Sequence, residues 1–194
     1  MSDHHHYMLN KPYGYLSQLI TNAHNDRKHK LLGELYDFVP GTMSIGRLDS
    51  HSEGLLLLTT NGKVSTAITS QHFEKEYYVQ VDGIITDEAI EMMENGMELY
   101  IKKEHVKTLP ARVKRIENPN LWERARRIRD DRHGPSSWIS VTINQGMYRQ
   151  VRRMTAAAGF PTLRLVRMRI GHHVLGDLKT GEAKEISDPS LQES

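Results

Sequence analysis

The chain has 194 residues, no cysteine, and 26 Lys and Arg against 24 Asp and Glu, which gives a net charge of +2. This length suffices for one domain, or for two closely packed subdomains, with a buried core. The composition excludes disulfides and thiolate metal sites, and the lack of both a long apolar run and a signal-peptide pattern predicts a soluble, cytoplasmic protein without a membrane partner.

The first half of the chain alternates apolar strand patterns with short helical ones. Strands are expected in three segments that are apolar or rich in Tyr and Val: Met8-Leu9, 55–59 and 73–81. A helix is expected at 32–39, since its apolar residues recur at helical spacing before the stop signal Pro40-Gly41. A shorter helix is expected at 62–69.

The second half begins with a helix that Thr86 is expected to cap, with Ala89 and Met93 in its apolar stripe. Strands are expected in three further segments, of which the second alternates polar and apolar residues and should be half-buried: 113–116, 139–143 and 163–170. The very basic stretch 122–135 is expected to be an exposed arm, and 148–158 a helix. Strands and helices without regular βαβ order predict an α+β fold with a mixed, mostly antiparallel sheet and flanking helices.

Positive charge is concentrated in one part of the sequence. Between Arg112 and Arg169 there are 14 basic residues against four acidic ones, and all the basic ones except Lys114 are arginine. The planar guanidinium suits phosphate and stacks on bases, so a polyanion such as RNA is the favoured partner. The alternative is a solvated basic face without function.

The carboxylate of Asp49 lies in a polar, glycine-bracketed segment that runs from Gly46 to Gly54 and precedes four consecutive leucines. A chain presents a reactive side chain in this way, on a loop anchored by a buried strand. An aspartate before a strand also commonly serves turn formation, so this segment alone leaves both interpretations open.

Three arginines of the expected helix at 148–158 are spaced so that they cannot all share its buried face: Arg149, Arg152 and Arg153. At least one should reach a cleft, where it could hold Asp49 ionised by lowering its pKa, or the helix is simply basic on its surface. On the preceding strand, Tyr77 could stack on an extruded base or fill the core.

Three segments, in this order, resemble the motifs of RNA pseudouridine synthases: Gly46-Arg47-Leu48-Asp49, Lys75-Glu76-Tyr77-Tyr78-Val79 and Gln145-Gly146-Met147-Tyr148-Arg149-Gln150-Val151-Arg152-Arg153-Met154. The RsuA/RluB/RluE/RluF branch, which Asn10-Lys11-Pro12-Tyr13-Gly14 and 159–165 also resemble, is the most similar. The resemblance implies the pseudouridine synthase fold, with two subdomains around a central basic cleft, over 7–187. Residues 1–6 and 188–194 are expected to be disordered tails. Since the first motif starts at about Leu9, the chain is similar to the short RluE type.

The resemblance also implies roles for individual residues. Asp49 would be the catalytic nucleophile, Tyr77 would pack on the target base, Arg152 would pair with Asp49, and Arg47 would help to flip the nucleotide. RNA would be bound by one lysine and four arginines: Lys75, Arg149, Arg153, Arg164 and Arg167. The chain departs from the branch at Gln145, where Glu is usual, and at Tyr148, where Asn or His is frequent.

The sequence therefore predicts an isomerase that converts one uridine of ribosomal RNA, by similarity to RluE in 23S rRNA or a pre-ribosomal particle, to pseudouridine. No metal or cofactor is expected, because no histidine pattern has metal-ligand spacing, and the protein is expected to act as a monomer. Two other classes stay open at this point. A non-catalytic RNA-binding or ribosome-assembly protein would tolerate loss of Asp49, and a nucleotide glycosidase would release free uracil.

Overall fold

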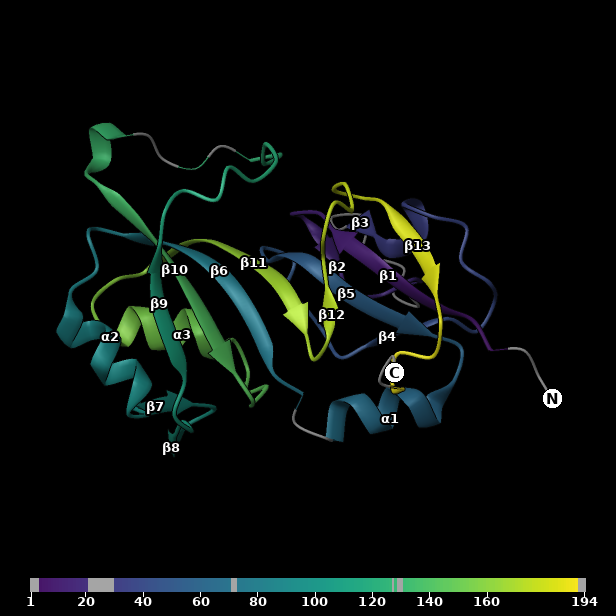
Figure 1. The fold of residues 1–194 in the computed structure, drawn as a ribbon, viewed down its shortest axis with the longest axis horizontal. Coiled ribbons are helices and arrows are strands. Elements are labelled where there is room, and N and C mark those ends of the chain that lie inside the picture. The colour runs from purple at the N-terminus through teal and green to yellow at the C-terminus, as the bar shows by residue number, and fades with distance from the viewer. Residues whose placement is uncertain (1–3, 21–29, 71–72, 127, 129–130, 192–194) are drawn as a thin grey trace. The chain divides into compact units, whose positions relative to one another are not determined.

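The computed structural model describes residues 4–20, 30–70, 73–126, 128 and 131–191, which form two compact units. Unit 1 comprises Met1–Phe73 and Arg167–Ser194, and unit 2 comprises Glu74–Val166. The boundary falls inside strand β11 (Thr162–Ile170), which gives residues to both units. The fold is α+β with mostly antiparallel strand pairing, as predicted (Figure 1). None of the helices in the described ranges has the length and apolar character needed to cross a membrane.

Unit 1 is built around β5 (Glu53–Thr59), in which every residue is buried. β1 (His6–Lys11) pairs antiparallel with β5 on one edge and with β13 (Ala183–Ile186) on the other. β4 (Met43–Ile45) also pairs with β5, and β12 (His173–Val174) pairs with the end of β11. Helix α1 (Gly62–Ser70) is the short helix that was predicted after the leucines, and it contacts β4 and β5. The four leucines thus form a strand that is covered on both faces.

The prediction of a helix at 32–39 is wrong. Only a single 3-10 turn, η1 (Leu32–Glu34), forms there, after the two-residue parallel pair of β2 (Tyr15–Leu16) and β3 (Lys30–Leu31). Leu32 is fully buried in a cluster with residues of β1 and β5, and Leu35 and Phe38 pack against the same cluster. The apolar spacing reflects packing of an irregular chain onto the sheet, which outweighed local helix propensity.

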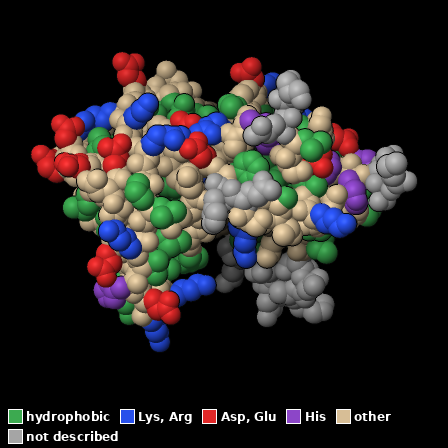
Figure 2. All heavy atoms as spheres, turned by 60° about the horizontal axis from the view of Figure 1, so that its bottom comes forward, with side chains coloured by type: hydrophobic (Ala, Val, Ile, Leu, Met, Phe, Trp, Pro, Cys, Tyr) green, Lys and Arg blue, Asp and Glu red, His purple; other side chains and the backbone are tan. Residues whose placement is uncertain are grey.

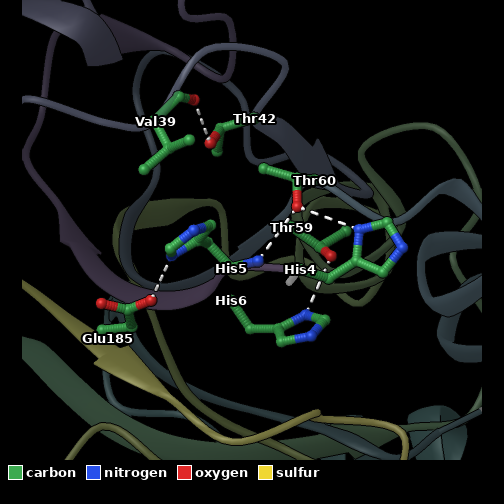
Figure 3. A network of polar contacts seen from close by, with 8 residues as sticks. All are labelled: His4, His5, His6, Val39, Thr42, Thr59, Thr60 and Glu185. Carbon is green, nitrogen blue, oxygen red and sulfur yellow. Dashed lines mark hydrogen bonds and ion pairs between the residues drawn. The ribbon is translucent and has the colours of Figure 1, made fainter. Parts of the chain in front are cut away.

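Both terminal segments that were expected to be disordered contain ordered residues. β1 begins at His6, whose ring nitrogen lies 2.9 Å from the Thr59 hydroxyl, and the backbone N–H of His5 donates to Thr60 (Figure 3). At the other end, Ser190 donates to the Asp188 carboxylate from both its backbone and its side chain. Pairing with β5 and β13 orders the start of the chain. Residues 1–3 and 192–194 lie outside the described part.

Unit 2 contains the antiparallel sheet β6-β10-β9, with β6 at Lys75–Asp82, β10 at Ser136–Ile143 and β9 at Arg112–Ile116. Helix α2 (Asp87–Glu94) contacts β9 and is capped as predicted, with the Thr86 hydroxyl accepting from Ala89 N–H. Helix α3 (Gln150–Ala157) follows β10 (Figure 1). The strand segment 139–143, which was expected to be half-buried, is buried throughout. Its polar face tolerates burial at Ser140 because the hydroxyl donates a hydrogen bond to the Glu76 carboxylate.

Unit 2 also contains a β-hairpin that no sequence pattern indicated. β7 (Glu98–Ile101) and β8 (Glu104–Lys107) pair antiparallel across a two-residue turn made by Lys102 and Lys103. Both lysines have positive φ, 51° and 71°, as a type I′ turn requires. Such turns normally use Asn-Gly or Asp-Gly, so two lysines gave no indication of a hairpin.

Candidate active site

The segment before Asp49 is held by the backbone and by one buried hydroxyl. Gly46 has a φ of +69°, which turns the chain out of β4. The Ser17 hydroxyl donates to the Leu48 carbonyl at 2.8 Å and accepts from the Leu48 N–H at 2.9 Å. Ser17 and Leu48 are both buried, whereas Asp49 is half-buried. Leu48, the residue before the carboxylate, is therefore held through both of the peptide groups that flank it.

The turn that contains Asn10-Lys11-Pro12-Tyr13-Gly14 packs against the other side of this loop. The Gly14 N–H donates to the Ser50 carbonyl at 2.7 Å, and the rings of Tyr13 and His51 stack with centroids 5.2 Å apart. The Ser52 N–H in turn donates to the Asp49 carbonyl, which closes a tight turn. Two motifs that are some 35 residues apart in sequence thus form one structural element in unit 1.

Lys11 is fully buried at the end of β1, and its ammonium donates to the carbonyls of Pro12 at 2.9 Å and Tyr15 at 2.7 Å. Burial lowers the pKa of Lys11 to about 7, against the opposing effect of Glu53 and Asp49, while Arg167 adds to the lowering. Lys11, Glu53, Asp49 and Arg167 therefore interact electrostatically within unit 1.

Sequence reasoning assigned no role to Lys11, Ser17 or Glu53. Lys11 had a weak signal, because it follows the apolar residues Tyr7, Met8 and Leu9 on the same strand after only one polar residue. Ser17 had none, since its importance comes only from its contact with Leu48. Glu53 is 1% exposed, and its place in the polar segment, separated from the leucines by Gly54, suggested a loop residue and not a buried carboxylate.

The remaining predicted residues of unit 1 differ in exposure. Arg47 is exposed two residues before Asp49, where it can contact a ligand. Arg167 is buried, with 3% of its surface exposed, so it does not lie on the surface that its predicted RNA contact would require. This burial corrects the expectation that Arg167 binds RNA directly.

In unit 2, Tyr77 lies on β6 and is 8% exposed. It pairs with Val141 of β10 and shares its face of the strand with Lys75 and Val79, because side chains alternate along a strand. Lys75 is half-buried. The structure thus gives Tyr77 a largely buried side chain.

Helix α3 begins at a strained residue. Arg149, which precedes its first turn, has a φ of +52° in the left-handed region, a conformation that costs about 1–3 kcal/mol for a residue other than glycine. The first turn of α3 is fixed by the side chain of Gln150. Its amide N–H donates to the Gln145 side-chain oxygen, and its amide oxygen accepts from the Met147 N–H. Gln145 also accepts from the Leu109 N–H. The residue that departs from the family pattern therefore has a clear structural role as a neutral acceptor.

The arginines of α3 are half-buried, as the helical spacing predicted for side chains that leave the core face. Arg153 donates to the Tyr100 carbonyl at 2.7 Å and lies over the Tyr148 ring. Arg152 belongs to unit 2 and Asp49 to unit 1, so their ion pair would join the two units and stays a prediction. The same holds for contact between Tyr77 and Asp49.

The charges are mixed on the surface. On the face drawn in Figure 2, Lys and Arg side chains lie next to carboxylates and do not form one continuous patch. Arg112 and Arg115 of β9, for example, pair with Glu74 and Asp87. Within the ranges that the structure describes, no three His, Asp or Glu residues gather as a metal site would require.

Comparison with known proteins assigns the chain to a family. Residues 5–157 match the model of the RNA pseudouridylate synthases. Ribosomal large subunit pseudouridine synthase E of Vibrio vulnificus is 44% identical over 187 residues, which cover 94% of this chain and 75% of that protein. The enzyme of the same name from Xanthomonas campestris is 41% identical, covering 90% of this chain and 91% of that protein. A crystal structure of a pseudouridylate synthase superposes with a TM-score of 0.75 at 29% identity, covering 96% of this chain and 72% of that one.

Proposed function

The chain belongs to the RNA pseudouridylate synthase family, and we propose that it isomerises one uridine of 23S ribosomal RNA with Asp49 as the nucleophile. Family membership makes it an RNA pseudouridine synthase, which is an isomerase, and argues against a non-catalytic RNA-binding protein. The relatives named for the large ribosomal subunit support ribosomal RNA as the substrate class. The protein acts in this proposal as a cytoplasmic monomer on ribosomal RNA or a pre-ribosomal particle.

The observation that carries the proposal is the way Asp49 is presented. Its loop is held by Ser17 on one side and by the Pro12–Gly14 turn on the other, and its charge interacts with the buried cation Lys11. A turn residue needs no such support. A catalytic carboxylate does, because catalysis requires a fixed position and an ionised state before the substrate arrives.

The reaction breaks the C1′–N1 bond, rotates the uracil and forms a C1′–C5 bond. C5 loses its proton and N1 gains one, so the product has the mass of the substrate and neither a metal nor a redox cofactor is needed to balance the step. Attack of Asp49 on C1′ and proton removal from C2′ to form a glycal are the two routes that release the base. Both need the ionised carboxylate of Asp49.

The target uridine must leave its stack, which costs a few kcal/mol. In the proposal, Tyr77 packs on the extruded base, Arg152 pairs with Asp49, and exposed Arg47 holds the flipped nucleotide. Contacts of Lys75, Arg149 and Arg153 with the RNA offset the cost of extrusion, while Arg164, which is only 6% exposed, contributes positive charge and not a surface contact.

The test is the single substitution Asp49→Asn, assayed on ribosomal RNA by mapping pseudouridine and by measuring free uracil. The expected result is no pseudouridine and no uracil, with circular dichroism and RNA affinity close to those of the parent protein. Asp37→Asn is the matched control, since Asp37 is an exposed aspartate of the same unit. Full pseudouridine formation by Asp49→Asn would contradict the assignment of Asp49 as the catalytic residue. Release of free uracil by the parent protein would show that the protein is a glycosidase.

The choice of RNA is tested separately. Pseudouridines are mapped in 16S and 23S rRNA from cells with and without the gene. We expect one site in 23S rRNA to be lost and to return when the parent gene, but not the Asp49→Asn gene, is supplied. Loss of a 16S site instead would overturn the large-subunit substrate and leave the isomerase intact.

A further inference from the structure

Unit 2 contains a cavity of about 790 Å³ that takes no part in the proposed chemistry. Side chains from β6, β10 and β11 form one part of its wall: Gln80, Trp138 and Arg164. The other part comes from the segment that leads into the basic arm and from the start of that arm: Asn118, Asn120, Leu121, Trp122, Glu123, Arg124, Ala125 and Ile128. The volume is within the range of small-molecule sites in proteins. All these residues belong to one unit, so the cavity is defined by unit 2 alone.

Both tryptophans of the chain line this cavity. Trp122 comes from the arm, and Trp138 from β10. The guanidinium of Arg164 lies over the Trp122 ring, 5.6 Å from its centre. An indole and a guanidinium plane are the surfaces on which unstacked bases pack in single-stranded RNA recognition.

The arm is not a freely exposed segment at this point, contrary to the expectation for 122–135. Arg164 donates to the Trp122 carbonyl at 3.0 Å, and Arg124 donates in the other direction to the Leu163 carbonyl at 3.3 Å. These two bonds tie the arm to β11 from both sides. The aromatic wall of the cavity is therefore preorganised, which lowers the cost of ordering it on binding.

The cavity is separate from the proposed target-base site. Gln80 and Trp138 are directly opposite each other on β6 and β10, so they share one face of the sheet. Tyr77 is three residues before Gln80 on the same strand and lies on the other face. A base bound between Trp122 and Trp138 is thus not the base that packs on Tyr77.

One of the residues that line the cavity, Gln80, also carries a buried polar atom without a partner among the described residues. The Gln80 amide donates from Nε2 to the Ser136 hydroxyl at 2.9 Å, and within the described part of the chain its buried Oε1 has no hydrogen-bond partner. A buried acceptor without a partner costs free energy unless a ligand supplies a donor. Because Oε1 has almost no accessible surface, the Gln80 side chain must turn into the cavity before a nucleobase N–H can donate to it. A phosphate carries no such donor.

We propose that this cavity binds a second, unstacked nucleobase of the substrate RNA, between Trp122 and the Trp138–Gln80 side of the sheet. The inference rests on the proposed RNA-modifying function and adds a subsite to it. Arg124 and Arg164 supply positive charge for the attached backbone, and Glu123 is the carboxylate among the lining residues. The site would select RNAs in which a nucleotide besides the target uridine is unpaired.

The two tryptophans give this proposal a direct readout, because intrinsic tryptophan fluorescence of the protein comes from this cavity alone. The probes are the hexaribonucleotides A6, C6 and U6, and a matched hexamer whose sugars carry no bases. We expect saturable quenching by at least one base-bearing hexamer and none by the abasic one. Equal quenching by the abasic hexamer means a phosphate site, and absence of quenching by all four means no RNA site; either result overturns the proposal.

Substitutions locate the bound base. Affinity for the best hexamer, labelled and followed by anisotropy, should fall about 5- to 100-fold in Trp122→Ala and remain near the parent value in Trp122→Phe, which keeps a stacking ring. Gln80→Ala should also weaken binding, whereas Gln18→Ala, at an exposed glutamine of unit 1, should not. If Trp122→Ala does not fold, Gln80→Ala decides whether the base binds in this cavity. An affinity of Gln80→Ala equal to that of the parent protein then contradicts the proposal.

The same assay separates this proposal from the proposed function. Asp49→Asn should bind and quench like the parent protein, although it forms no pseudouridine. If the parent protein isomerises uridine but its fluorescence is not quenched by any hexamer, the subsite is rejected and the proposed function remains. Intact quenching in a protein that modifies no RNA would reject the function and leave a base-binding cavity.

Discussion

The guanidinium of Arg167 donates from Nε to the backbone carbonyl of Leu55, 2.8 Å away, and so ties β11 to β5 inside unit 1. This arginine was expected to bind RNA, together with the other basic residues of its strand. Its contact explains instead why a cation is buried beside a leucine strand. The carbonyl of Leu55 would lose its charged donor if the side chain were replaced.

We therefore expect Arg167→Met to lower the free energy of unfolding by about 1–3 kcal/mol, as is typical when a buried acceptor loses its partner. Urea denaturation measures this loss. The slope of log affinity for ribosomal RNA against log salt concentration should stay unchanged in Arg167→Met. Arg126→Met, at an exposed arginine of the arm, should show the reverse: unchanged unfolding and a slope reduced by about 1. A reduced slope in Arg167→Met would restore its role as an RNA contact.

Ser17 is expected to act on catalysis through Leu48. Ser17→Ala removes both bonds that hold the residue before Asp49, so the carboxylate loses its fixed position. We expect the single-turnover rate of pseudouridine formation to fall at least tenfold, while RNA affinity changes less than threefold. Ser70→Ala, at the exposed end of α1, is the control. A parallel loss of rate and affinity would show that Ser17 supports the fold in general.

Lys11 should make the stability of the protein depend on pH. Its pKa is about 7 in the folded protein, mainly because of burial, and returns to its ordinary, higher value on unfolding. Between these values the unfolded chain binds more protons, so the free energy of unfolding should rise with pH above about 7, by at most about 1.4 kcal/mol per pH unit. Below pH 7 this group contributes no slope.

The substitution Lys11→Met tests this assignment. Unfolding by urea is measured at intervals from pH 7 to pH 10 in the parent protein and in Lys11→Met, and the rise should be smaller in the variant. Lys63→Met, at an exposed lysine of α1, should keep the parent slope. Identical slopes in all three proteins would mean that Lys11 is not the titrating group.

Gly96 is expected to tolerate no side chain. It has a φ of +77°, and an added Cβ would lie 2.5 Å from the Thr108 carbonyl oxygen. Gly96→Ala should therefore destabilise the protein by about 2 kcal/mol or more, from left-handed strain plus the close contact. Gly62→Ala, at the open start of α1, should be neutral or slightly stabilising. Midpoints of urea unfolding compare the two, and similar values would contradict the packing described around Gly96.

Sequence reasoning located the longer strands and the three α-helices in the described part of the chain, because long periodic patterns report burial directly. The leucines of β5, the capped helix α2 and helix α3 were each predicted within a few residues of their limits. It was wrong at 32–39, where apolar spacing served irregular packing on the sheet. It missed the β7–β8 hairpin, since Lys102 and Lys103 adopt a turn that their side chains do not favour.

For the candidate site, the motifs were enough to identify the family and the residues to test, because the order and spacing of the motifs around Asp49, Tyr77 and Arg152 can be recognised without any knowledge of contacts. Which charges are buried, and what holds the loop, became visible in the folded chain alone. The burial of Lys11 and Arg167 and the two bonds of Ser17 to Leu48 arise between segments far apart in the chain. A linear pattern records that a residue is charged or polar. It does not record the removal of water around it, and that removal sets both its pKa and its partners.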